Sequence, residues 1–291
     1  MVASRVPPGM ARPVAVSIAP GAILFTVFFL APFAVLIGSS FASWGGLDFT
    51  FTGWDNYQTM VQDPVFWKAV RNTLFYSAVS IVIQVPFGVV VGIILSQKLP
   101  GWRTFRTVIF VPFVISGAAY ALVYAAFYNS RYGLLNQTLS VVGAGGKDWL
   151  YDTSTARSAV AATFAFIIGF TVILVMAEIA SIPRELYEAA ETDGASLLQQ
   201  HLRITLPLLR NVIGTCILVR LLGDIGMFDV VFILTSGGPN DSTVTLALYA
   251  YRAYLDGAWG YANAVGTTIL LIGLILIVTV RRAFRIGERA L

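Results

Sequence analysis

A short acidic segment, residues 182–207, has the spacing best suited to contacts with another protein. Pro183 fits the first turn of a helix, and Glu185 and Glu188 follow where negative charge stabilises the positive helix end. Further residues recur at three- and four-residue spacing and so share one face: Leu186, Ala189, Ala190 and Asp193. The pattern predicts a short amphipathic helix.

A second short helix is expected directly after the first. Gly194 can end the first helix, and the next begins near Ala195 and runs to Pro207. Small alanines let another surface come close, and the acids offer charge-assisted hydrogen bonds to Arg or Lys. A docking helix and a plain connector lying on a membrane fit this geometry equally well.

Long apolar runs must position this segment. The chain is 57% hydrophobic and only 12% charged, whereas soluble domains carry about 25% charge. Six runs approach the roughly 20 residues that cross a bilayer: Val14–Phe41, Asn72–Ser96, Val108–Tyr128, Ala156–Ala180, Leu208–Thr235 and Ala264–Val280. We therefore expect an all-α integral membrane protein with about six transmembrane helices, the first of them retained rather than cleaved as a signal peptide.

The distribution of basic residues predicts the orientation. With both termini cytoplasmic, the inside segments hold about twice as many Lys and Arg as the outside loops. The net charge of +4 then reflects these loops rather than a nucleic-acid partner. The expected organisation is a cytoplasmic tail (1–13), a first span with its outer loop (14–71), a core transmembrane domain (72–281) that contains the acidic segment (181–207), and a basic cytoplasmic tail (282–291).

Seven positions of the acidic segment resemble a known motif. Glu188-Ala189-Ala190, Gly194, Ile204 and Leu206-Pro207 are similar to the EAA loop of binding-protein-dependent ABC importer permeases. The resemblance covers almost the whole chain and is strongest to the maltose- and glycerol-phosphate-type carbohydrate branch. Asn72-Thr73-Leu74 and the Gly237-Gly238-Pro239 loop look like segments of that branch.

This resemblance implies a type I importer permease fold and a set of partners. These are a second related permease, two cytoplasmic ATPase subunits that carry ATP and magnesium, and an extracytoplasmic solute-binding protein. The chain itself would carry no cofactor and lie in the cytoplasmic membrane of a bacterium or archaeon. Its ATPase-coupling residues would be Glu185, Glu188, Ala189, Ala190, Asp193, Gly194, Ile204, Leu206 and Pro207.

The predicted fifth span has three charged residues in its interior, away from its ends. Arg220 and Asp224 are four apart and share a face, and each unpaired charge costs about 2.5–3.5 kcal/mol at mid-membrane. A structural ion pair is therefore favoured over a polar lining of the solute path. Asp229 is rotated by about 140° from Asp224 on an ideal helix. It becomes a candidate for the solute path if Gly226 breaks the helix.

Aromatic and amide groups give further candidates for the solute path. Phe164, Phe166 and Phe170 could stack on sugar rings, although packing against neighbours or lipid is the commoner role. Gln84 could line the path, and an interhelical hydrogen bond is the more usual role for such a residue. His201 and Cys216, single residues of their types, have no partners at metal-ligand or disulfide spacing.

No motif for catalysis is present. Residues 143–148 contain Gly-Gly-Lys but lack the first glycine and the Ser/Thr of a phosphate loop, so we expect no enzyme activity of this subunit. Two alternatives stay open: an ion-gradient-driven secondary transporter, and an ABC permease for a non-sugar solute. Secondary transporters are often built from inverted repeats, which this sequence does not display.

Overall fold

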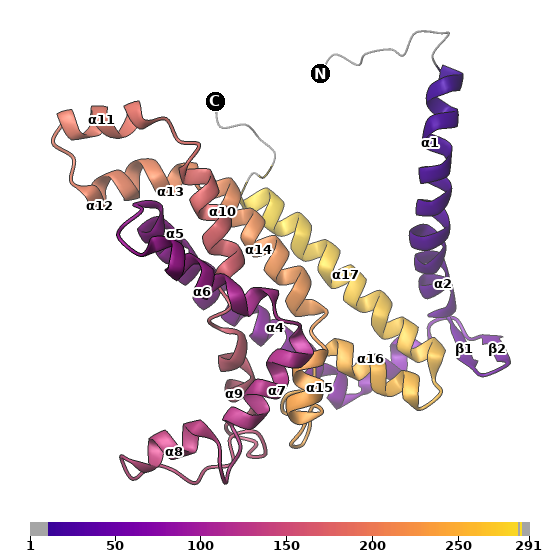
Figure 1. Cartoon of the computed structure of the whole chain (residues 1–291). Helices are drawn as coiled ribbons and strands as arrows, with labels where there is room; N and C mark the ends of the chain where they lie inside the picture. The colour runs from indigo at the N-terminus through magenta and orange to yellow at the C-terminus, as the bar shows by residue number, and fades with distance from the viewer. Residues whose placement is uncertain (1–10, 285, 287–291) are drawn as a thin grey trace.

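Helices make up nearly all the regular structure in the computed structural model, which describes residues 11–284 and 286 (Figure 1). Four helices are long and apolar enough to cross a membrane, or up to six if two sharply bent helix pairs each count as one span. The predicted helical membrane protein is thus confirmed, but two of its spans are not straight.

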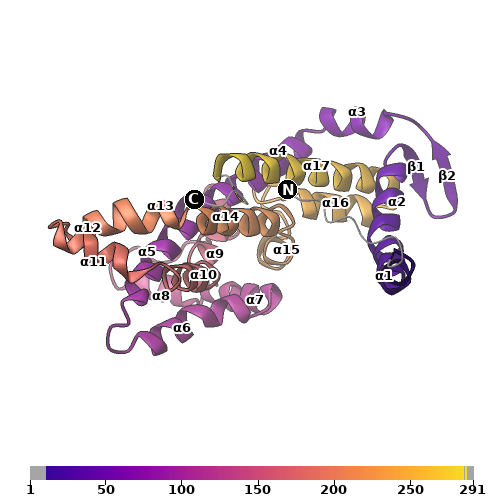
Figure 2. The ribbon, with the colours of Figure 1, turned by 90° about the horizontal axis from the view of Figure 1, so that it is seen from above.

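The first span stands apart from the rest of the chain. It consists of α1 (Ala11–Phe25), the π-helical turn η1 (Thr26–Leu30) and α2 (Ala31–Ser39). The most apolar 18-residue window of its stretch Val16–Ser39 buries no residue within the described chain. Seen from above, it lies at one edge of the molecule (Figure 2). The last residue of α2 is held to α17 (Trp259–Phe284), since Asn263 Nδ2 donates to Ser39 Oγ at 2.8 Å.

A small β-hairpin follows, where the sequence predicted only a loop. Strands β1 (Ala42–Gly45) and β2 (Asp48–Phe51) pair antiparallel, and α3 (Asp55–Gln62) comes next. The Trp44 ring lies edge-on to Trp259, with 5.4 Å between ring centroids. This contact fixes the hairpin to the start of α17 (Trp259–Phe284).

The second span is longer than predicted. It runs from Pro64 rather than Asn72 through α4 (Pro64–Val79), η2 (Ser80–Gln84) and α5 (Val85–Ser96). Asp63 caps it by accepting a hydrogen bond from the Val65 N–H at 2.7 Å. A helix of 33 residues is about 50 Å long, more than the roughly 30 Å of hydrocarbon it has to cross. The first turns of α4 can therefore extend beyond the apolar layer.

Two glycines bring α5 close to α10 (Gly169–Ile179). A Cβ atom on Gly88 would lie 2.7 Å from Thr171 Cβ, and one on Gly92 would lie 2.7 Å from Val175 Cγ1. This spacing of small residues is a common device for packing membrane helices, because it lets two backbones approach. Helix α9 (Ala156–Phe164) precedes α10 and is separated from it by residues 165–168.

Two of the predicted spans, Val108–Tyr128 and Leu208–Thr235, are interrupted. Helix α6 (Trp102–Val114) meets α7 (Gly117–Phe127) at an angle of 100°. Ser116 between them is extended and caps α7 by accepting from the Ala119 N–H at 3.3 Å. Helix α14 (Arg210–Ile225) ends at Gly226, and α15 (Asp229–Thr235) starts anew, as the glycine permitted.

The remaining short helices gather at one end. Helix α8 (Leu134–Ser140), α15 and α16 (Leu246–Leu255) lie with the hairpin opposite α11 (Arg184–Thr192) and α12 (Leu197–Gln200) (Figure 1). We call this end the outer end. A buried cluster centred on Tyr76, Val160, Val231 and Leu246 packs there. The first residues of α1 and the last of α17 lie toward the other end (Figure 1), in line with two termini on one side.

Candidate functional sites in the α11–α13 arm and the membrane helices

The acidic segment forms a helical arm that projects from the body of the molecule (Figure 1). Helix α11 (Arg184–Thr192) is followed by α12 (Leu197–Gln200), the π-helical turn η3 (His201–Thr205) and α13 (Leu206–Leu208). Gly194 makes the turn with a φ of 77°, a conformation that favours glycine. Ser196 and Gln199 then form a capping box that starts the second helix.

A hydroxyl pair ties the two halves of the arm together. Tyr187 Oη on α11 lies 2.9 Å from Thr205 Oγ1 on η3, and Thr205 is fully buried. His201 Nδ1 lies 3.2 Å from the same hydroxyl oxygen. These contacts join α11 to η3 across the turn at Gly194. This polar contact was not predicted, because Tyr187 and Thr205 are distant in sequence.

The free surface of the arm combines acids, alanine and leucine. No residue of α11 is buried in the described structure, and Glu185, Glu188 and Ala189 are exposed. Asp193, Gly194 and Pro207 are exposed too, whereas Ala190, Ile204 and Leu206 are half-buried. Large apolar side chains add to this surface: Leu186, Leu197, Leu198 and Leu202. Acids beside exposed leucines favour a protein partner over lipid tails, since charged groups avoid hydrocarbon.

The structure does not contain the ion pair between Arg220 and Asp224 that their spacing favoured. Arg220 Nη2 instead donates to the backbone oxygen of Ile167 at 2.5 Å, and no ion pair joins the two side chains. Ile167 lies in the break between α9 and α10, where carbonyl groups lack the regular helical partner. Asp224 is buried, and its Oδ2 has no hydrogen-bond partner among the described residues.

Arg220 belongs to a junction where three membrane helices meet. The rings of Phe113 on α6 and Phe170 on α10 stack with 5.4 Å between centroids. The Arg220 guanidinium on α14 lies 5.9 Å from the Phe113 ring centroid, within the range of cation–π contacts. We call Phe113, Ile167, Phe170 and Arg220 the break junction. Phe113 was not predicted, although the neighbouring Pro112 signals the end of α6.

Asp229 lies apart from the break junction. It is exposed in the first turn of α15, and the break at Gly226 puts it on a different helix from Asp224. Its carboxylate faces the start of α7, because a Cβ atom on Gly117 would lie only 2.5 Å from Asp229 Oδ2. The acid is thus positioned between two broken helices.

The other aromatic candidates have different surroundings. Phe164 is buried and packs edge-on to Tyr76, with 5.7 Å between centroids. Phe166 is 63% exposed and contacts Phe87. Gln84 is buried and donates from Nε2 to the Phe164 backbone oxygen, the interhelical hydrogen bond that such a residue usually makes. Only Phe170 of the three phenylalanines joins the break junction.

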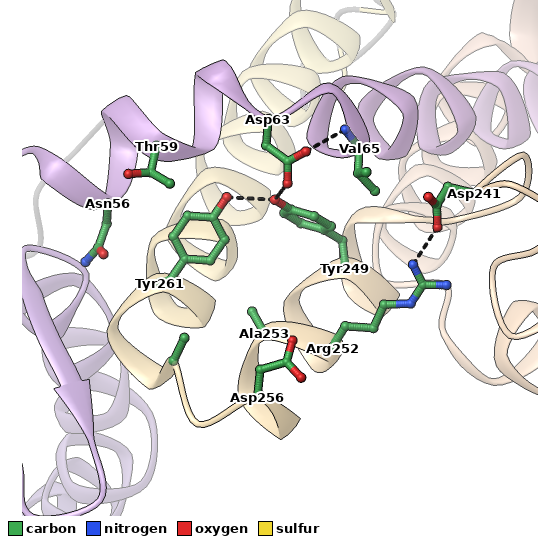
Figure 3. A pocket seen from close by; sticks show the side chains of 11 residues that line it. Asn56, Thr59, Asp63, Val65, Asp241, Tyr249, Arg252, Ala253, Asp256 and Tyr261 are labelled. Carbon is green, nitrogen blue, oxygen red and sulfur yellow. Dashed lines mark hydrogen bonds and ion pairs between the residues drawn. The ribbon is translucent and has the colours of Figure 1, made fainter.

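A pocket of about 540 Å³ opens at the outer end (Figure 3). The Tyr249 hydroxyl on α16 donates to Asp63 and lies 2.7 Å from the Tyr261 hydroxyl on α17. Arg252 and Asp241 form an ion pair at 2.7 Å (Figure 3). These groups satisfy one another, so the pocket joins α4, α16 and α17. No sequence pattern predicted this pocket, since Asp63 and Tyr249 are 186 positions apart.

Comparison with known proteins agrees with this architecture. Residues 68–289 match the family described as binding-protein-dependent transport system inner membrane component. The probable ABC transporter permease protein YurN of Bacillus subtilis is 35% identical over 275 residues, covering 92% of this chain and 94% of that protein. The trehalose/maltose transport system permease protein MalF of Thermococcus litoralis is 31% identical over 237 residues, covering 79% and 78%.

A solved structure supports the fold independently. One chain in the crystal structure of a bacterial ABC transporter involved in the import of the acidic polysaccharide alginate superimposes with a TM-score of 0.83. The two chains are 24% identical, and the match covers 96% of this chain and 98% of the other. This chain therefore belongs to the binding-protein-dependent transport system inner membrane component family of ABC importer permeases.

Proposed function

We propose that this chain is one transmembrane permease subunit of an ATP-driven importer for a carbohydrate or related polyol. Family membership supports the importer class, and the trehalose/maltose permease among its relatives supports the solute class. In this proposal a second, related permease completes the path, and a binding protein delivers the solute at the outer end. The assembly would lie in the cytoplasmic membrane, with the outer end extracytoplasmic.

The projecting α11–α13 arm is the observation that carries this proposal. Its exposed Glu185 and Glu188 offer charge-assisted contacts to basic residues of a cytoplasmic ATPase. Ala189 allows close approach, and Gly194 gives the tight turn. Two ATPase subunits, which would hold ATP and magnesium, supply the energy, one of them through this arm and the other through the second permease.

The connection between arm and membrane suggests how force is transmitted. The helical segment Leu197–Leu208, which ends in α13, leads through the buried Leu209 into α14, with a bend of 62° between the segment and α14. Helix α14 carries Arg220, whose hydrogen bond reaches Ile167 between α9 and α10. When the ATPases close on ATP, movement of the arm would displace α14 against the break junction. The solute path would then open alternately to each side of the membrane.

Charge reversal on the arm tests its coupling role. In the importer assembled in vesicles, Glu188→Lys should insert normally but lose transport while ATP hydrolysis continues. Glu191→Lys is the matched control, because Glu191 is an exposed acid of the same helix outside the motif positions. Unimpaired transport by Glu188→Lys would remove the coupling role from this residue.

Identification of the companions tests the assembly and the solute class. The chain should be purified from its native membrane in mild detergent, and the proteins that accompany it identified by mass spectrometry. We expect a second permease, an ATPase and a binding protein whose bound solute is a carbohydrate or polyol. Purification without any ATPase, even after gentle cross-linking, would contradict an importer. A non-carbohydrate solute would contradict the solute class alone.

A further inference from the structure

A second pocket at the outer end differs in charge from the one in Figure 3. Its volume is about 270 Å³, and it lies between α4, the start of α9 and the loop before α16. Two arginines and four hydroxyl groups are among its lining residues: Arg71, Phe75, Thr153, Ser154, Arg157, Ser158 and Ser242. No acidic side chain lines it.

The two arginines have no counter-charge in the described chain. Neither Arg71 nor Arg157 makes an ion pair there, in contrast to Arg252 of the first pocket, which pairs with Asp241. The Arg157 guanidinium instead stacks over the Phe75 ring at 4.6 Å from its centroid. The nearby Asp152 uses Oδ1 to accept from the Ser154 N–H and hydroxyl at 2.8 and 2.7 Å.

The backbone adds further positive potential. Arg157 is the second residue of α9, where the helix dipole is positive and a basic side chain is unfavourable. Thr155, the N-cap residue, makes no side-chain capping bond, although the first N–H group, that of Ala156, donates to the Asp152 backbone oxygen at 2.9 Å. Two guanidinium groups and the positive end of a helix therefore lie around a pocket that no acidic side chain lines. A bound anion would relieve their mutual repulsion.

A hydroxyl donor is also left available. Ser154 and Ser158 already donate, to Asp152 Oδ1 and to the Thr155 backbone oxygen at 2.9 Å. Ser242 Oγ is buried yet has no hydrogen-bond partner in the part of the chain that the structure describes. Its own N–H is used by the Pro239 carbonyl, so the free hydroxyl is a donor for a ligand.

We propose that Arg71, Arg157 and Ser242 form a binding site for an oxyanion group, such as a carboxylate, sulfate or phosphate. Arginine forks match the paired oxygens of these groups. The oxyanion can be a soluble anion or the headgroup phosphate of an anionic phospholipid. The surroundings fit a lipid, because Trp67, Arg71 and Phe75 are spaced by four on α4, and aromatics gather at headgroup level.

Two measurements distinguish a soluble anion from a phospholipid headgroup. In the first, the full chain in neutral detergent is melted in sulfate and in chloride at equal ionic strength. In the second, native mass spectrometry compares retention of phosphatidylglycerol with that of phosphatidylcholine. Arg157→Gln should weaken anion or lipid binding by about tenfold, the loss expected for one charge-assisted hydrogen bond. Arg131→Gln is the control, an exposed arginine outside the pocket.

Each outcome is decisive. Sulfate-specific stabilisation that Arg157→Gln loses and Arg131→Gln keeps assigns the site to soluble anions. Selective retention of phosphatidylglycerol with the same variant pattern assigns it to lipid. Arg71→Gln changes an exposed side chain and repeats the test if Arg157→Gln does not fold. The proposal is overturned if neither probe binds selectively, or if both pocket variants bind like the wild type.

Discussion

Arg220 of α14 donates from Nη2 to the backbone oxygen of Ile167 at 2.5 Å, across the break between α9 and α10. Ile167 is 53 residues away in sequence, and its carbonyl is available because the helix is interrupted there. The guanidinium is also within cation–π range of Phe113. One charged side chain thus links three membrane helices whose relative movement the proposed mechanism requires.

Removal of this donor should weaken both stability and transport. Arg220→Met keeps an unbranched side chain but leaves the Ile167 oxygen without its partner, and we expect a loss of about 1 kcal/mol, the scale of side-chain hydrogen bonds in membranes. Unfolding of the chain from mixed micelles measures this change. Leu222→Met, at an exposed position of the same helix, is the control. Equal stability of the two variants would contradict a bridging role for Arg220.

The α11–α13 arm was predictable because local sequence patterns determine it. The break junction was not, because its contacts join residues that are far apart in sequence. Pro183, Gly194 and the small residues between them determine the arm within a few turns, and Gly226 marked the end of α14. The 100° turn at Ser116 interrupts an apolar run whose hydropathy carries no information about direction. The partner of Arg220 was predicted wrongly for a related reason. Spacing by four identified Asp224, but a broken helix elsewhere supplied the carbonyl.

The hydroxyl pair of the arm should matter for coupling more than for folding. Tyr187→Phe removes the hydroxyl that lies 2.9 Å from Thr205 Oγ1 and keeps the ring. We expect faster hydrogen exchange of α11 amides and a lower ratio of solute transported to ATP hydrolysed. The control is Tyr132→Phe, at an exposed position near α8. Unchanged exchange in α11 would show that this bond does not hold the arm together.

Close packing of α5 on α10 should make Gly92 sensitive to a single methyl group. Gly92→Ala would place Cβ 2.7 Å from Val175 Cγ1 and 2.9 Å from Val175 Cβ. We expect destabilisation of about 1–3 kcal/mol from overpacking. Gly273→Ala is the matched control in a membrane helix, because its Cβ would meet nothing within 4 Å. If Gly92→Ala unfolds at the same denaturant concentration as Gly273→Ala, the close approach is not needed.

The hydrogen-bonded groups of the pocket in Figure 3 should make stability sensitive to alkaline pH. Burial first, and then the hydrogen bond to Asp63, raise the pKa of Tyr249 above its ordinary value of 10.0. Above pH 10 the unfolded chain releases this proton while the folded chain keeps it, so the linked stability is full below pH 10 and falls as pH rises beyond it. Tyr249→Phe should show a shallower alkaline decline in melting temperature.

The same variant has a second expected effect at neutral pH. Without the Tyr249 hydroxyl, the half-buried Asp63 carboxylate loses a donor, and a hydrogen bond to a charged group contributes about 1.5–3 kcal/mol. Tyr254→Phe is the control on α16, because Tyr254 is 55% exposed. A pH profile of Tyr249→Phe that overlays those of the control and the wild type would refute the assigned role of this tyrosine.

Asp229 provides the most direct test of the solute path. Its exposed carboxylate faces Gly117 at the start of α7, where a sugar hydroxyl could be bound in place of water. Asp229→Asn keeps the size and an acceptor oxygen but removes the charge, so we expect normal insertion and a transport rate lowered by about tenfold, the loss of one charged hydrogen bond. Asp256→Asn, an exposed acid on the outer end, should leave transport unchanged. Equal transport by both variants would place Asp229 outside the path, because a carboxylate that contacts the solute cannot be neutralised without cost.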